Sequence, residues 1–284
     1  MIDRIMKRSG EKAYLRDMKR LDLSRLDPSV EEYTDISFAD DDNNEHKLDV
    51  YCCKDGTVKP VLIDLHGGGF ISHDKKIDRL YCNYMASQGF VVFSVNYRLA
   101  YPEYNVFDQV EDVDCAVRWV LEHAAEYEGD TGSLNIAGHS SAGVLAVTEV
   151  LLCNDEKMRA DYGISPRTYK YRSIILDCGL MHFYKRSLAY WGMRRMVFPR
   201  YYKRTMKYEY MLFEKNPMLR TLPNTVLITN RRDELKDMTY YFKGLLDRSS
   251  VQNELIDEGE DGHMGIVFKP WNLVSYTQDR IPRT

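Results

Sequence analysis

Several features are scarce in this 284-residue sequence, and each absence excludes a class of protein. The longest apolar runs, such as residues 90–95, are far shorter than the roughly 20 residues that a membrane-spanning helix needs. The N-terminal residues contain no apolar core of the kind found in a secretory signal. Repeats of fixed period and low-complexity tracts are also missing. We therefore expect a cytoplasmic protein without stable insertion into a membrane.

Cysteine occurs at only six positions, and these lie mostly inside apolar stretches. Such surroundings favour buried, reduced thiols over a disulfide framework. The chain is 44% hydrophobic and 29% charged, which is typical of a folded protein. A single α/β domain of this length can bury a sizeable core without disulfide bonds.

The formal net charge of −4 conceals an uneven distribution of charge along the chain. Residues 181–220 contain ten Lys or Arg residues against two Glu residues. The basic residues at 194–207 form either a solvated surface or a surface that attracts an anionic substrate or a membrane. Because the whole chain is acidic and carries no recognised nucleic-acid-binding motif, we expect no nucleic-acid partner.

Short apolar runs alternate with helical patterns over most of the chain. Apolar runs bounded by turn residues are typical of strands buried on both faces of a parallel sheet. We expect strands over residues 60–65, 90–97, 134–137, 171–177, 225–229 and 253–257, and helices over 77–87, 110–127, 142–153 and 238–247. A hairpin of strands precedes them at 33–38 and 46–52, after a helical region at 1–33 that breaks at Gly10. The alternation predicts an α/β fold with a mainly parallel sheet flanked by helices.

Residue types that carry chemistry follow the predicted strands, where ligand sites of parallel sheets lie. A His-Gly-Gly-Gly sequence at residues 66–69 leaves backbone N–H groups open to a ligand. In residues 135–143 a strand runs into a helix with only small residues at the join, so a serine there projects its hydroxyl above the sheet. We favour Ser140 over Ser141 as the nucleophile, because small residues lie two positions to either side of Ser140.

An acid and a base follow the last two predicted strands. Asp233 and His263 each lie in a loop after one of these strands. A histidine can take a proton from a serine hydroxyl at neutral pH, and a carboxylate orients the imidazole. We assign the base to His263 and favour Asp233 as the acid, with Glu234 and Asp177 as alternatives.

Together these motifs resemble the α/β-hydrolase superfamily and, within it, the hormone-sensitive-lipase-like carboxylesterases. The resemblance covers about residues 45–270. The sequence at 66–69 is similar to that family's His-Gly-Gly-Gly motif, and residues 95–103 resemble its Tyr-Arg-Leu-Ala-Pro-Glu segment. The sequence departs from the family at Ala142, where the Gly-x-Ser-x-Gly motif has glycine, and by one inserted residue at Tyr101.

The resemblance implies an α/β-hydrolase fold with a helical cap over the active site. It also implies an oxyanion hole formed by the backbone N–H groups of Gly68, Gly69 and Ser141. Neither a cofactor nor a metal is expected. The oligomeric state, including a homodimer, stays open.

Two segments lie outside the core pattern, at residues 1–33 and about 180–220. In related enzymes these regions form the cap, so we expect the hydrolase core to comprise residues 34–284 around it. The second segment is rich in aromatic residues, which suit an enclosed apolar pocket. As substrate contacts we name Phe70, Tyr190, Trp191 and Met264.

The function expected from this resemblance is hydrolysis of carboxylic esters through an acyl-enzyme. We expect soluble esters with short acyl chains of about two to six carbons, such as acetylated carbohydrates, because the cap segments suggest an enclosed pocket. The alternatives are a serine peptidase of the same fold and a non-catalytic protein that binds a small ligand on this scaffold.

Overall fold

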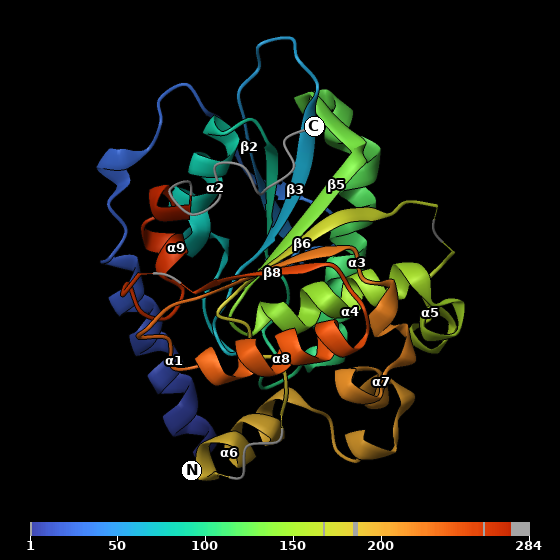
Figure 1. Cartoon of the computed structure of the whole chain (residues 1–284). Helices are drawn as coiled ribbons and strands as arrows, with labels where there is room; N and C mark the ends of the chain where they lie inside the picture. The colour runs from blue at the N-terminus through green and yellow to red at the C-terminus, as the bar shows by residue number, and fades with distance from the viewer. Residues whose placement is uncertain (1, 167, 184–186, 258, 274–284) are drawn as a thin grey trace.

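A single mixed sheet forms the centre of the protein (Figure 1). The structure, a computed structural model, describes residues 2–166, 168–183, 187–257 and 259–273. Within these residues, eight strands pair in the order β1-β2-β4-β3-β5-β6-β7-β8. They are β1 (Glu31–Ser37), β2 (Lys47–Cys52), β3 (Lys59–Leu65), β4 (Val91–Val95), β5 (Gly129–His139), β6 (Tyr171–Asp177), β7 (Asn224–Thr229) and β8 (Asn253–Asp257). Among these eight strands, β1–β2 and β2–β4 pair antiparallel and the other five pairs are parallel, so the sheet is mainly parallel, as predicted.

Helices cover both faces of the sheet. One face carries α2 (Arg79–Ser87) and α9 (Gly265–Phe268), and the other carries α3 (Val106–His123), α4 (Ala142–Asn154) and α8 (Lys236–Arg248). Successive strand residues point to opposite faces, so Leu62 packs in one apolar cluster and Ile63 in the other. This burial on both sides explains why the central strands are continuous apolar runs.

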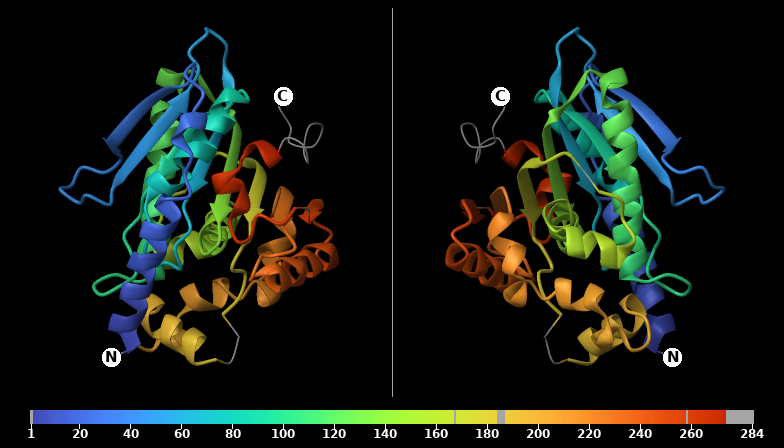
Figure 2. Two further views of the ribbon diagram at one scale, coloured as in Figure 1. Left: turned by 90° about the vertical axis from the view of Figure 1, so that its left-hand side faces the viewer. Right: turned by 90° about the vertical axis from the view of Figure 1, so that its right-hand side faces the viewer.

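The remaining helices lie at the ends of the sheet. The longest of them is α1 (Ile2–Met18), and the others include α5 (Glu156–Tyr162), α6 (Leu188–Val197) and α7 (Met206–Tyr210), with short 3₁₀ turns between them. In both views of Figure 2, α1 and α6 lie side by side beyond the sheet. Within the described residues, no helix is both long and apolar enough to cross a membrane.

The structure corrects three details of the expected elements. The helical region expected at 1–33 ends at Met18, and only a 3₁₀ turn at Leu23–Arg25 separates α1 from β1. The α1 helix continues through Gly10, where a break was expected. One glycine destabilises a helix by only about 1 kcal/mol relative to alanine, and packing contacts of the helix can offset that free energy. The α5 helix was not predicted, since its seven residues are too few to show a helical period. The expected cap segments include residues 1 and 184–186, which lie outside the described residues.

Candidate active site

Ser140 occupies a sharp turn between β5 and α4. Its φ of 52° lies in the left-handed region, which few residues other than glycine adopt. Its N–H donates a hydrogen bond of 2.8 Å to the carbonyl of Asp177, and its carbonyl accepts one of 2.8 Å from the N–H of Leu180. These two bonds hold the turn against the end of β6 and leave the hydroxyl free to project from the sheet.

Small residues around Ser140 are a steric requirement of this turn. A side-chain Cβ at Gly138 would lie 2.6 Å from the carbonyl oxygen of Ala142, far closer than atoms approach in proteins. At the other flank, the methyl group of Ala142 is accommodated in the core. The departure from the usual glycine at this position therefore fits the turn.

The structure places His263 and Asp233 in line with Ser140. The Oγ of Ser140 is 2.8 Å from Nε2 of His263, and Nδ1 of His263 is 2.8 Å from Oδ1 of Asp233. Because an ionised carboxylate only accepts hydrogen bonds, Nδ1 carries the proton and donates it to Asp233. In the neutral imidazole, Nε2 is then the acceptor for the serine hydroxyl.

The carboxylate of Asp233 is buried but well supplied with donors. Burial alone would raise the pKa of Asp233, but hydrogen bonds from the imidazole, a backbone N–H and a threonine hydroxyl outweigh burial and lower this pKa. The last two donors are Leu235 N–H at 2.9 Å and Thr229 Oγ1 at 2.7 Å. Asp233 therefore stays ionised at neutral pH.

The glycine loop passes directly beside Ser140. A Cβ at Gly67 would lie 3.1 Å from Cβ of Ser140, and one at Gly68 would lie 1.9 Å from the carbonyl oxygen of Ser72. Among the described residues, no acceptor takes the backbone N–H of Gly68, Gly69 or Ser141. Three unpaired donors beside a nucleophile can stabilise a negatively charged oxygen.

His66 and its neighbours support this loop from behind. The ring of His66 stacks on Tyr97 with a centroid distance of 4.3 Å, and its Nδ1 lies 2.7 Å from the carbonyl oxygen of Gly67. Burial lowers the pKa of His66 to about 4, so the neutral ring donates this bond. Gln109 donates to the carbonyl of Phe70 at 2.8 Å. Tyr97, in the segment at 95–103, and Gln109 thus support the glycine loop.

A buried charged network beneath Ser140 is a feature that sequence reasoning missed. His139 lies between Asp64 and Asp177, with distances of 3.0 Å from its Nε2 and Nδ1 to the two carboxylates. Burial opposes protonation, but the charge of Asp78 and the two hydrogen-bonded carboxylates raise the pKa of His139 well above its ordinary value. The sequence signal for this network was a pair of acids, Asp64 and Asp177, near the carboxyl ends of β3 and β6. Asp177, an alternative for the acid, is therefore engaged with His139.

Two groups of side chains of metal-ligand type lie close together in the described part of the chain. One is Cys178 with Asp233 and His263, and the other is Asp64 with Asp78 and His139. In each group the histidine already bridges hydrogen-bonding partners. These hydrogen bonds explain why the side chains of each group lie close together.

A cleft of about 500 Å³ opens above Ser140 and His263. Helix α1 forms one wall with Met6, Ser9, Gly10 and Ala13, and α6 forms another with Ala189, Tyr190 and Met193. The cleft is of the size that small-molecule sites have.

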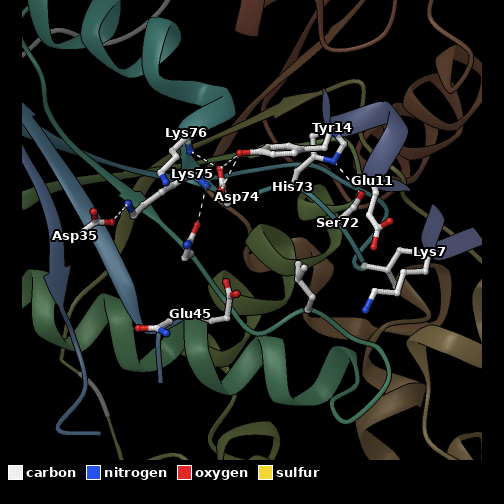
Figure 3. Close-up of a pocket in the computed structure, with 14 residues that line it drawn as sticks. Lys7, Glu11, Tyr14, Asp35, Glu45, Ser72, His73, Asp74, Lys75 and Lys76 are labelled. Atoms are coloured by element: carbon white, nitrogen blue, oxygen red, sulfur yellow. Dashed lines mark hydrogen bonds and ion pairs between the residues drawn. The ribbon is translucent and has the colours of Figure 1, made fainter. Parts of the chain in front are cut away.

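Contacts to the loop after the glycine motif hold α1 in place. Figure 3 shows the hollow behind this loop, where the hydroxyl of Tyr14 donates to the carboxylate of Asp74 at 3.1 Å. The rings of Tyr14 and His73 meet edge to face at 5.4 Å. Residues 60 positions apart thus connect the N-terminal helix to the loop of the site.

The four expected substrate contacts divide into two pairs. Tyr190 and Met264 line the cleft. Phe70 is fully buried, and its ring packs against Phe183 in the core. Trp191 lies on the other face of α6, where it lines a neighbouring hollow. The expectation for Phe70 and Trp191 is corrected accordingly, because neither faces the cleft.

Residues 48–189, half of the chain, match the BD-FAE family. The chain belongs to the BD-FAE family. This match contains the glycine loop, Ser140 and the buried network, whereas Asp233 and His263 lie beyond it. The chain is also 38% identical over 95 residues to esterase LipI of Mycobacterium tuberculosis, a match that covers 33% of this chain and 29% of LipI.

Solved structures with the same fold cover almost the whole chain of this BD-FAE protein. Esterase B from Lactobacillus rhamnosis has a TM-score of 0.85 at 20% identity, with 96% of this chain and 93% of the esterase covered. Brefeldin A esterase, a bacterial homologue of human hormone-sensitive lipase, has a TM-score of 0.73 at 21% identity, with 96% and 82% covered. The fold is therefore that of the α/β-hydrolases, as the sequence motifs predicted.

Proposed function

We propose that this protein is a serine hydrolase of carboxylic esters. The observation that carries the proposal is the continuous hydrogen-bonded line from Ser140 through His263 to Asp233 at the floor of a cleft. A serine hydroxyl is a weak nucleophile unless a base takes its proton, and this line supplies the base and its orienting carboxylate.

The proposed reaction has two halves that balance in protons. Oγ of Ser140 attacks the ester carbonyl while its proton passes to Nε2 of His263. The imidazolium then gives that proton to the departing alcohol, which leaves an acyl group on Ser140. In the second half, water attacks the acyl-enzyme and gives a proton to His263. His263 passes this proton to Oγ of Ser140 as the carboxylic acid leaves.

The negative charge that develops on the carbonyl oxygen needs hydrogen-bond donors. We assign this role to the N–H groups of Gly68, Gly69 and Ser141. The unpaired state of these donors supports the assignment, since they need not give up another acceptor when the charge forms. Ser141 also begins α4, whose N-terminal end favours negative charge.

We propose that α1 and the segment 188–221 act as a cap on the hydrolase core. Both segments wall the cleft above Ser140, and neither contributes a strand to the sheet. A walled cleft of this volume suits a short acyl group, which supports the preference for acyl chains of about two to six carbons. Esterase B, which has the same fold, has been crystallised with a C4-C4 tributyrin phosphonate.

Two measurements test the nucleophile. Hydrolysis of p-nitrophenyl acetate should fall by at least about 10³-fold in Ser140→Ala, as in triad deletions of other hydrolases. A fluorophosphonate should label Ser140 in the unchanged protein, as read by mass spectrometry of peptides. Ser141→Ala is the matched control and should retain the label. Labelling at Ser141 would contradict the assignment.

A panel of p-nitrophenyl esters from acetate to palmitate tests the acyl preference. We expect kcat/KM to be highest between acetate and hexanoate, because the walls that α1 and α6 form can orient a short acyl group at Ser140. A higher rate for palmitate than for butyrate, below the solubility limit of each, would overturn the short-chain preference and leave the nucleophile untouched.

A further inference from the structure

A second hollow lies on the far side of α6 from the cleft. It has a volume of about 700 Å³. Its lining residues are basic, aromatic or proline: Trp191, Arg194, Arg195, Phe198, Pro199, Arg200, Tyr201, Tyr202 and Lys203. The lining, within the described residues, contains four cations and no carboxylate. Such a hollow attracts groups with negative charge.

Three of the four cations of this hollow, Arg195, Arg200 and Lys203, lie over aromatic rings. The guanidinium of Arg195 lies 5.1 Å from the ring of Trp191, and that of Arg200 lies 4.8 Å from the ring of Tyr201. In the part of the chain that the structure describes, no carboxylate pairs with Arg195, Arg200 or Lys203. Lys207, by contrast, pairs with Glu111 at 2.8 Å. The charges of Arg195, Arg200 and Lys203 are therefore available to an external anion.

Exposed apolar side chains gather at the same end of the molecule. The exposed fraction is 70% for Leu188, 60% for Tyr201 and 44% for Trp191. The N-terminal half of α1, which lies beside α6 in Figure 2, adds an exposed isoleucine, Ile5. It also carries the basic residues Arg4, Lys7 and Arg8, and the next turn of α1 adds Glu11 and Lys12. Basic, aromatic and apolar side chains thus surround the two helices that wall the cleft.

We call the surface formed by the N-terminal half of α1, α6 and the lining of the second hollow the basic end. We propose that the basic end docks reversibly on an anionic lipid surface. Lys and Arg bind the phosphate headgroups, while Trp and Tyr enter the boundary between headgroups and acyl chains. A free phosphate would use the cations but not the exposed apolar side chains, which is why we commit to a lipid surface. The rest of the chain is acidic, so an anionic surface repels it and attracts the basic end. This difference orients the molecule with its basic end toward the surface.

Docking in this orientation gives the cleft access to esters at the surface. Helix α6 presents Tyr190 and Met193 to the cleft and Trp191 and Arg195 to the hollow, so one helix connects the two sites. This consequence rests on the proposed ester hydrolysis, whereas the docking itself does not.

Cosedimentation with vesicles tests the docking independently of catalysis. The full-length Ser140→Ala protein is mixed with vesicles of phosphatidylcholine alone, or with vesicles that also contain about 30% phosphatidylglycerol. The added lipid makes the second surface strongly anionic. We expect binding to the anionic vesicles at least about tenfold tighter than to the neutral ones, and weaker as salt is raised. Equal binding to both vesicles would overturn the proposal.

A matched pair of variants locates the surface. Arg195→Gln, Arg200→Gln and Lys203→Gln together should weaken binding to anionic vesicles at least about tenfold, since each basic residue near the surface contributes. Lys54→Gln, Arg172→Gln and Arg248→Gln remove the same charge at the opposite edge of the sheet and should leave binding within about twofold. Equal losses in both triples would show a net-charge effect and overturn the assignment.

Two further arms separate a lipid surface from free phosphate. Trp191→Ser with Tyr201→Ser should also weaken binding to the vesicles several-fold, because the exposed rings enter the surface. Inorganic phosphate at about 10 mM, at constant ionic strength, should displace little of the bound protein. Displacement by phosphate together with no effect of the two serine substitutions would assign the hollow to a soluble phosphate and reject docking.

Discussion

At the scale of single residues, atomic crowding at the end of β5 decides which residue types can surround the nucleophile. Gly138 faces the carbonyl of Ala142, and Gly67 faces Ser140 and Met264. The strained φ of Ser140 is held by backbone bonds to neighbouring segments. The site is therefore built on backbone contacts that larger side chains would break.

Gly138→Ala should destabilise the protein by about 1–3 kcal/mol, because its Cβ would lie 2.6 Å from the carbonyl oxygen of Ala142. Urea unfolding measures the free energy. Gly244→Ala is the control, since a Cβ in this α8 position would meet only the end of Arg248 at 3.4 Å, and it should be neutral or stabilising. An unchanged free energy in Gly138→Ala would show that the turn relaxes.

Asp233→Asn should lower kcat by about 10⁴-fold, because an amide can hold His263 in the wrong tautomer. Added to Ser140→Ala, the same change should lower the rate little further, since the residues act as one unit. Steady-state kinetics of the single and double variants provide the comparison. Asp177→Asn serves as a contrast: it contacts His139, and its effect should be on stability first. Additive losses in the double variant would count against a common mechanism.

At the scale of elements, helical periodicity separates neighbouring residues into different environments. Successive residues of a helix are about 100° apart, so Tyr190 faces the cleft while Trp191 faces the hollow. Helix α4 behaves differently, because it is buried nearly all round and holds an acid, Glu149, in the core. The hydroxyls of Tyr169 and Tyr171 donate to Glu149 at 3.0 Å each.

Burial raises the pKa of Glu149 to about 7, although the tyrosine hydroxyls oppose the shift. The folded protein then binds a proton more tightly than the unfolded chain. This contribution to stability is complete below pH of about 4.5 and is lost as the pH rises to about 7, which amounts to about 3 kcal/mol.

Glu149→Gln should remove this part of the pH dependence, because glutamine keeps an oxygen acceptor for the tyrosines and does not ionise. At pH 8 we expect the variant to be more stable than the unchanged protein, as measured by Tm or urea unfolding. The variant Glu156→Gln, at an exposed position of α5, is the control and should leave the slope between pH 5 and 7 as it was. A lower Tm for Glu149→Gln at pH 8 would contradict the assigned cause.

At the scale of the whole molecule, segments far apart in sequence combine to form the cleft. Its walls come from α1 and α6, while its floor comes from the ends of β5 and the loop after β8. The hydroxyl of Tyr14 connects α1 to the loop at Asp74. The shape of the cleft thus depends on how the N-terminal helix docks.

Tyr14→Phe should raise KM for short esters by about threefold to tenfold with kcat within about twofold, because the loss of one hydrogen bond loosens α1 without touching Ser140. Michaelis kinetics on p-nitrophenyl butyrate measure both constants. Tyr33→Phe, which removes a hydroxyl bonded to Glu31 in β1, is the matched control and should change neither. An unchanged KM in Tyr14→Phe would show that α1 does not shape the substrate site.

The sequence by itself determined the order in which strands and helices follow one another along the chain. It also determined the positions of the glycine loop and the serine turn. These features depend on local patterns, since burial on both faces makes a strand continuously apolar and a tight turn excludes large side chains. β6 and β8 have the bounds that the sequence predicted. Residues 19–30 and α5 were less predictable, because short segments show no period.

Only the tertiary structure decided which side chains meet across the fold. It places Asp233, the acid favoured from the sequence, beside His263, and it places the alternative Asp177 beside His139. It also turns Phe70 into the core and Trp191 away from the cleft, against expectation. Contacts between distant segments depend on the spatial order of the strands in the sheet and on how each helix is rotated about its axis. The local sequence of either contacting segment does not specify these two features.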